Sequence, residues 1–224
     1  MAVYTTIDDS GLFFNTILYT GDGTTKTISG VGFQPDMVWG KGRNSVSSHS
    51  LIDAVRGVTK SIFPDTGAIE DTNATSYLTG FTADGYTVNS ASNFNVSARE
   101  QVNWNWKANG AGSSNEDGSI NTISTSVSTT AGFSISTYTG TESADTVGHG
   151  LGAVPKAVIV KKLSQSDDWF SYHEPLGNLG RMMLSDNVAV SNGSSHWNST
   201  TPTSSVFSVI NNGANNAVGE TLVA

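Results

Sequence analysis

The sequence predicts an all-β protein made of two tandem antiparallel β-sandwich modules, of the lectin or jelly-roll type, related by internal duplication. Three observations predict this fold. Short β-branched and aromatic runs recur between Gly, Asn, Asp and Pro turns. No window carries the 3.6-residue apolar period of an amphipathic helix. The stretch YTGDGTTKTISGVGFQP at 19–35 returns as YTGTESADTVGHGLGAVP at 138–155.

The expected strands are short and lie between turn-forming residues. Runs such as NTILYT, DMVW, QVNWNW, GFSISTYTG and KAVIVKK concentrate the residue types that fit a pleated, half-buried surface. Asp-Gly pairs at 22–23, 84–85 and 117–118 are typical of tight hairpin turns. The best local helix candidate is 51–60, and Gly57 weakens it because glycine disfavours a helix interior.

The internal similarity extends well beyond the first shared motif. Residues 13–107 and 132–224 match in the same order, at an offset that stays near 120 residues. Collinear matches over most of both halves indicate a duplicated module. The matched positions are Tyr19-Thr20-Gly21 with Tyr138-Thr139-Gly140, Pro35 with Pro155, Met37-Val38-Trp39 with Ala157-Val158-Ile159, Lys41 with Lys161, and Arg99 with Gly219.

This repeat divides the chain into four parts. We expect an N-terminal anchoring segment at 1–15, a first module at 16–108, a linker with a lead-in strand at 109–131, and a second module at 132–224. The stretch SINTISTSVSTT at 119–130 alternates apolar and polar residues, which favours an extended strand. The second copy stops at ETLVA, where Trp104 and Trp106 of the first copy would fall. Its last strand is therefore expected to be short, either because the chain is a fragment or because a partner completes that edge.

Composition excludes several classes of function. The chain has 11 Lys and Arg residues spread thinly and a net charge of −8, which argues against nucleic-acid binding. No apolar stretch approaches 18 residues, so membrane insertion is not expected. The chain has no cysteine, which excludes disulfides and thiolate metal sites. The N-terminus has no signal-peptide pattern, so we expect synthesis in a cytoplasm.

We predict no catalytic residues, no metal and no cofactor. The carboxylate pairs are adjacent in sequence, and adjacent residues of a strand point to opposite faces, so one pair cannot flank a bond as acid and base. The four histidines lack paired metal-ligand spacing. No G-x-S-x-G motif is present. The adjacent pairs are Asp8-Asp9, Glu70-Asp71, Glu116-Asp117 and Asp167-Asp168.

The tryptophans allow two interpretations. Trp104 and Trp106 are two residues apart and face the same way in a strand, either as a sugar-stacking platform or, as we favour, as a core stripe. Trp169 in SDDWFSYHE and Trp197 in SSHWNSTTP stand among polar residues, as in a carbohydrate site. The alternative is that these loop tryptophans pin loops to the core. The candidate glycan-binding residues are Trp169, Tyr172, His173 and Trp197.

The order of motifs resembles a family of virion structural proteins from tailed phages of marine and cyanobacterial hosts, often described as tail fibre proteins. The stretch from MAVYTTIDDSGLFFNTILYTGDG to GFQPDMVWGKGR carries the resemblance, followed by LIDAVRGVTK, TGFTADGYTV and NWNWKANG. A second set, GFSISTYTG, GHGLGAVPKAVIVKK and YHEPLG, continues it, so the similarity spans nearly the whole chain. The resemblance implies lectin-like β-sandwich modules in tandem.

From this resemblance we expect a non-enzymatic virion structural protein, a tail fibre or adhesin component that assembles as a homotrimer. The N-terminal segment, with Tyr4, Ile7, Phe13 and Phe14, is expected to anchor it to other virion proteins. The modules are expected to recognise a host-surface glycan. The alternatives are a capsid decoration protein or head fibre, and a glycan depolymerase on the same scaffold.

Overall fold

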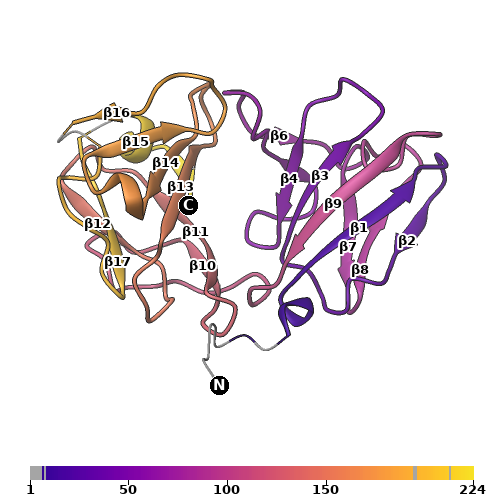
Figure 1. Ribbon diagram of the computed structural model, residues 1–224, viewed down its shortest axis with the longest axis horizontal. Helices are drawn as coiled ribbons and strands as arrows, with labels where there is room; N and C mark the ends of the chain where they lie inside the picture. Colours follow the sequence, from indigo (N-terminus) through magenta and orange to yellow (C-terminus); the bar gives the residue numbers. More distant parts are fainter. Residues whose placement is uncertain (1–6, 8, 194–195, 212) are drawn as a thin grey trace.

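A computed structural model describes residues 7, 9–193, 196–211 and 213–224, and it consists of several antiparallel sheets (Figure 1). The predicted all-β sandwich class is confirmed. Helical structure in this part of the chain is limited to two 3₁₀ turns, η1 at Ser10–Leu12 and η2 at Glu174–Leu176, and to α1 at Gly213–Asn216. The helix candidate at 51–60 instead contains strand β4, a turn and the first residue of β5.

The first module is a two-layer sandwich. One sheet has the order β1-β9-β3-β4, the other has the order β2-β8-β7, and β5 pairs with β6 beside them. Val38 and Ile52 from the first sheet pack against Tyr86 and Val88 from the second, and all four are fully buried. The strands are β1 Phe14–Thr20, β2 Lys26–Ile28, β3 Met37–Gly42, β4 Ser50–Asp53, β5 Lys60–Ser61, β6 Asp71–Thr72, β7 Leu78–Thr82, β8 Gly85–Val88 and β9 Glu100–Trp106.

The second module has the same construction with a longer main sheet. Its order is β10-β11-β18-β13-β14-β15-β16, and the pair β12-β17 forms the second layer. Tyr138 and Val160 of the main sheet share one buried cluster with Phe207 and Val209 of β17. The strands are β10 Ser124–Ser128, β11 Phe133–Thr139, β12 Asp145–Gly148, β13 Ala157–Lys162, β14 Phe170–His173, β15 Gly180–Met183, β16 Ser191–Asn192, β17 Val206–Val209 and β18 Thr221–Val223.

The two modules share one strand order. The run β1-β9-β3-β4 corresponds to β11-β18-β13-β14, and the pair β2-β8 corresponds to β12-β17, all with antiparallel neighbours. Strand β10, formed within the predicted lead-in segment, adds an extra edge beside β11. The common order is what a duplicated module would produce, and the duplication itself stays a prediction.

Strand β9 differs from its predicted orientation. Its burial alternates so that Gln101, Asn103 and Asn105 are buried, whereas Trp104 and Trp106 are half-buried on the opposite face. Trp104 and Trp106 are therefore not a stripe of the sandwich core, as the sequence analysis favoured. The amide of Asn103 faces inward, where the phenol groups of Tyr19 and Tyr86 need hydrogen-bond partners. Asn103 Nδ2 donates to Tyr19 Oη at 3.1 Å and to Tyr86 Oη.

The outward aromatic face of β9 helps to join the modules. Trp106 stacks on Phe133 of the second module, with 6.2 Å between ring centroids. A buried cluster bridges the modules, with Leu51 and Ile62 from the first and Ile135, Leu163, Trp169 and Val223 from the second. Figure 1 shows the modules side by side, with the segment after β9 crossing from one to the other.

Hydrogen bonds reinforce this apolar contact at one place. Trp169 Nε1 donates to Phe63 O at 2.9 Å and to Thr66 O at 3.1 Å, both in the first module. Nearby, Glu70 N donates to Leu163 O at 2.8 Å. The indole of Trp169 is therefore a structural link between modules, held by packing and by its single N–H donor.

Truncating this link should destabilise the protein. We expect Trp169→Ala to lower the free energy of unfolding by about 3 kcal/mol, in the range seen for buried aromatic truncations. Trp169→Phe, which keeps most of the bulk but loses the donor, should cost about 1 kcal/mol. Urea unfolding measures both. The matched control is Val46→Ala, since Val46 is fully exposed, and equal midpoints for all three variants would contradict the assignment.

Candidate functional site

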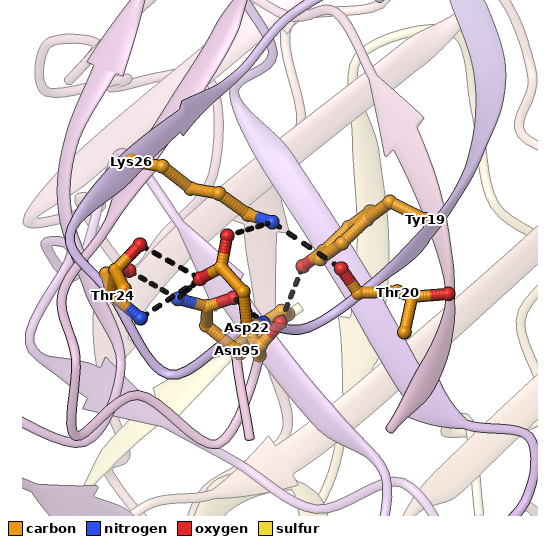
Figure 2. Close-up of polar contacts among 7 residues, drawn as sticks. Tyr19, Thr20, Asp22, Thr24, Lys26 and Asn95 are labelled. Carbon is orange, nitrogen blue, oxygen red and sulfur yellow. Dashed lines mark hydrogen bonds and ion pairs between the residues drawn. The ribbon is translucent and has the colours of Figure 1, made fainter. Parts of the chain in front are cut away.

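A hydrogen-bonded clamp joins the YTG turn of the first module to the loop before β9 (Figure 2). Tyr19 Oη donates to Phe94 O at 2.6 Å, and Asp22 N donates to Asn95 Oδ1 at 3.1 Å. Asn95 Nδ2 donates back to Thr24 O. Asn95 is fully buried, and burial raises the pKa of Tyr19 to about 12, so the phenol stays a donor. We call these contacts the YTG clamp.

The Asp22 carboxylate fixes the outer part of the same turn. It accepts from Thr24 N and Thr24 Oγ1, each at 2.8 Å, and pairs with Lys26 Nζ at 3.0 Å. The hydrogen bond from the Thr24 amide, followed by that from Lys26, holds the pKa of Asp22 well below its usual value. The turn is therefore ordered by its own side chains as well as by the clamp.

Gly21 lets the two backbones approach closely. A Cβ atom placed on Gly21 would lie 2.2 Å from Val96 O. Gly21 N donates to Arg99 O at 2.8 Å, and Ala98 N donates to Gly21 O at 2.9 Å. The clamp therefore fixes the backbone of residues 94–99, which leads directly into β9.

The second module repeats the YTG clamp. Tyr138 Oη donates to Asn215 O at 2.6 Å, Thr141 N donates to Asn216 Oδ1 at 2.9 Å, and Asn216 Nδ2 donates to Ser143 O at 2.7 Å. Gly140 N donates to Glu220 O at 2.9 Å. The motif shared by both halves of the sequence thus has the same structural role in each.

The repeated clamp corrects one aligned position. Arg99 O and Glu220 O accept the same hydrogen bond, so the counterpart of Arg99 is Glu220 and not Gly219. Gly219 instead matches Ala98. Both have positive φ, 74° and 60°, and both come just before the last strand. The residue with positive φ precedes the last strand of each module. Aligning Ala98 with Gly219 therefore moves the residue-by-residue alignment of the last strands by one position.

Beside the clamp of the first module lies a polar pocket of about 190 Å³. We call it the first-module pocket. One wall comes from the clamped loop and β9, and the other from β3 and the loop that follows it. The lining residues are Gly40, Lys41, Gly42, Ser47, Ser48, Ser50, Phe63, Asn93, Phe94, Arg99 and Gln101.

Two glycines of β3 let the walls of this pocket pack closely. A Cβ on Gly40 would lie 2.3 Å from the Phe94 ring, and a Cβ on Gly42 would lie 2.7 Å from Arg99 Cδ. In the second module the positions corresponding to Gly40 and Gly42 are Val160 and Lys162, both buried, and Lys162 Nζ pairs with Asp167 at 2.9 Å. The two glycines therefore distinguish the first module from the second at this position.

The lining of the pocket includes two cationic residues, Lys41 and Arg99, and its walls are held in place. Lys41 Nζ donates to Ser45 O at 3.3 Å and to Ser47 O, which fixes the loop after β3. Asn44 bridges this loop to the opposite wall, donating from Nδ2 to Ala98 O at 3.1 Å. Within the described residues the Arg99 guanidinium has no hydrogen bond or ion pair. Its donors can therefore bind a ligand.

A second, larger cavity of about 590 Å³ lies between the modules and is mainly apolar. Trp39, Trp106 and Phe133 contribute to its lining, and so does the C-terminal Ala224. We call this cavity the inter-module cleft.

Strand β18 has three residues against seven in β9, which agrees with the predicted short last strand.

The predicted glycan-binding aromatics do not form a stacking surface. Trp169, Tyr172 and Trp197 are 4%, 2% and 1% exposed. The indole N–H of Trp197 donates to Gly180 O at 3.1 Å, as that of Trp169 does to the first module. The polar neighbours of Trp169 and Trp197 in the sequence suggested exposed rings. The carbonyls that accept their indole hydrogen bonds are distant in sequence, so the buried positions could not be predicted from those neighbours. His173 is exposed at the end of β14, but the three candidate aromatic rings are buried and cannot form a sugar-binding face with it.

The predicted anchoring residues are only partly described. Tyr4 lies outside the described residues. Ile7 and Phe13 are half-buried, and Phe14 is 38% exposed, with its ring centroid 4.9 Å from that of Trp106. Phe14 thus contacts its own module, and the anchoring role stays a prediction.

The described part of the chain lacks a metal-binding cluster and a membrane-spanning helix. No group of three or more His, Cys, Asp or Glu side chains there could hold a metal ion. No helix found there is long and apolar enough to span a membrane.

The residues of the first-module pocket were not predicted from the sequence. Arg99 and Lys41 were noted as repeat positions, not as a site. The available signal was the pair Gly40 and Gly42 in a strand whose counterpart in the second module reads Val-Lys-Lys. Glycine inside a strand often marks the close approach of a ligand or of another backbone.

Fold and site together define a two-module all-β protein with a clamped polar pocket in its first module. The chain belongs to the family described as Domain of unknown function (DUF7483), whose match covers residues 9–224. The match spans both modules. No curated protein and no solved structure matched the chain.

The clamp glycines should be intolerant of any side chain. We expect Gly140→Ala to lower the free energy of unfolding by about 3 kcal/mol, because its Cβ would lie 2.2 Å from Ala217 O. Gly80→Ala is the control, since no atom lies within 4 Å of that Cβ. Chemical unfolding compares the two. A Gly140→Ala variant as stable as Gly80→Ala would show that the clamp is not a close backbone contact.

Proposed function

We propose that this chain is a non-enzymatic phage virion structural protein, a tail fibre or adhesin component, which recognises host-surface glycans through the first-module pocket. The observation that carries the recognition part is the pocket itself. It combines serine hydroxyls, Gln101 and Asn93, two cationic side chains and the half-buried Phe63 around one small concave space.

The size and chemistry of the pocket favour a sugar. Its volume of about 190 Å³ is below the roughly 300–1,000 Å³ of sites for drug-sized ligands, so it suits a group of monosaccharide size. Sugar hydroxyls both donate and accept hydrogen bonds, and the serine hydroxyls and amides here do the same. Gln101 is already fixed, because its Nε2 donates to Asn93 O at 3.1 Å. Preorganised walls reduce the entropy lost on binding.

The virion part of the proposal rests on the order of motifs shared with phage structural proteins. In this proposal the N-terminal segment contacts other virion proteins and the chain forms a homotrimer. The two modules form one continuous body through the Trp169 link, which suits a particle protein that works outside a cell without disulfides. The first-module pocket would then face the host.

The inter-module cleft favours a second candidate, a capsid decoration protein or head fibre. Val154 and Ile159, which line the cleft, are 44% and 38% exposed. A neighbouring subunit that covered them would remove apolar surface from water. In that arrangement the modules would bind capsid proteins instead of a glycan.

Blocking the pocket should abolish binding to host surfaces. We expect Ser48→Trp to reduce binding to immobilised cyanobacterial lipopolysaccharide at least tenfold, because the new indole would fill a lining position on an exposed loop. Val46→Trp is the matched control, because it adds the same side chain to the same loop at a fully exposed position that does not line the pocket. Surface plasmon resonance measures both, and equal binding by the two variants would contradict the proposed site.

Immunogold labelling of purified phage particles separates the two virion positions. An antibody raised against this chain should label the tail or its fibres. Label spread over the head would favour the decoration protein instead. Particles without label, in preparations where the antibody detects the free chain, would contradict a virion role.

A further inference from the structure

We infer that the first-module pocket binds the carboxylate of an acidic sugar, with the Arg99 guanidinium as its main partner. This inference rests on the proposed glycan recognition and specifies the class of sugar. The pocket gathers cations in a chain whose net charge is −8. Positive side chains in the pocket attract an anionic ligand, even though the chain as a whole is negative.

The Arg99 side chain is available for an ion pair. The neighbouring Arg43 already pairs with Glu100, at 3.8 Å between Nη1 and Oε2. Arg99 has no such partner within the described residues, yet it is half-buried over Gly42 and lines the pocket. A guanidinium in this position presents a planar set of donors that matches the two oxygens of a carboxylate.

The backbone that carries Arg99 is held at both of its peptide groups. Its carbonyl accepts from Gly21 at 2.8 Å, and its amide donates to Val96 O at 3.1 Å. The preceding residue, Ala98, has φ of 60°, a left-handed conformation that is unfavourable for a residue with a Cβ. The clamp holds Ala98 in this conformation, because Ala98 N donates to Gly21 O at 2.9 Å.

Lys41 adds a second positive charge to the lining of the pocket. Its ammonium group donates to Ser45 O and Ser47 O, which leaves one of its three hydrogens for a ligand. Serine and amide groups on the walls then remain for the sugar hydroxyls. The half-buried Phe63 supplies an apolar contact for one face of the sugar ring.

The second module provides an internal comparison. The position that corresponds to Arg99 is Glu220, whose carboxylate accepts from Gln165 Nε2 at 2.7 Å. Lys162, at the position of Gly42, is buried and paired. The clamp is the same in both modules, but the charge needed to bind a carboxylate occurs in the first. We therefore expect one acidic-sugar site per chain.

The test compares two trisaccharides that differ in the acid group, galacturonic acid trimer and galactose trimer, by NMR titration of the full chain. We expect the acidic trimer to bind at least tenfold more tightly. Arg99→Gln should remove this preference, and Arg99→Lys, which keeps the charge but loses the planar fork, should restore only part of it. Arg43→Gln is the control and should change the affinity less than twofold.

The outcomes separate this inference from the proposed function. If both trimers bind equally, and Ser48→Trp abolishes binding while Arg99→Gln does not, the glycan site stands and the acidic preference is wrong. If a sulfated galactose trimer binds far more tightly than the uronate, the carboxylate assignment is wrong. If none of the trimers binds while the folded wild-type chain binds the immobilised lipopolysaccharide, the acidic-sugar inference is wrong and the glycan site stands; if neither the trimers nor the lipopolysaccharide binds, both proposals fail. A matching thermal unfolding midpoint for Arg99→Gln and wild type shows that lost binding is not lost folding.

Discussion

The YTG clamp is the interaction on which the rest of each module depends. It ties the turn after β1 to the loop that enters β9 in the first module, and the turn after β11 to the loop that enters β18 in the second, so it sets where the last strand of each module starts. A buried asparagine provides the link in both modules, Asn95 in one and Asn216 in the other. Glycine is required beside it, because the backbones lie too close for a side chain. An amide suits this role, since it can donate to one backbone group and accept from another.

The surroundings of the clamp differ between the two modules. In the first it presents Arg99 over the glycines of β3 and leaves a polar pocket. In the second the corresponding positions carry Glu220 and Lys162, and Lys162 is buried and paired with Asp167. A stable scaffold with one variable wall is a common way for a fold to acquire a binding site, because the site is then a property of a few residues and not of the fold.

Much of the fold could be predicted from the sequence, whereas the site could not. Alternating strands and Asp-Gly turns are local signals, and the YTG motif proved to have the same contacts in both halves. The burial of Trp169 was not predictable, because its partners are the carbonyls of Phe63 and Thr66, more than 100 residues away. Polar neighbours in sequence suggested an exposed ring, yet an indole N–H can also be satisfied by buried backbone. Arg99 was overlooked because a single arginine carries no motif, and its significance depends on the missing side chains at positions 40 and 42.

The most direct test of the account is to map where a host-surface polysaccharide binds, using backbone amide NMR shifts of the full chain. We predict that the shifts change in two segments, 40–50 and 93–101, which form the walls of the first-module pocket, and that amides around the inter-module cleft stay unchanged. Changes confined to the cleft, at Phe133 and Val154 for example, would contradict the account. They would place recognition between the modules and not in the first one.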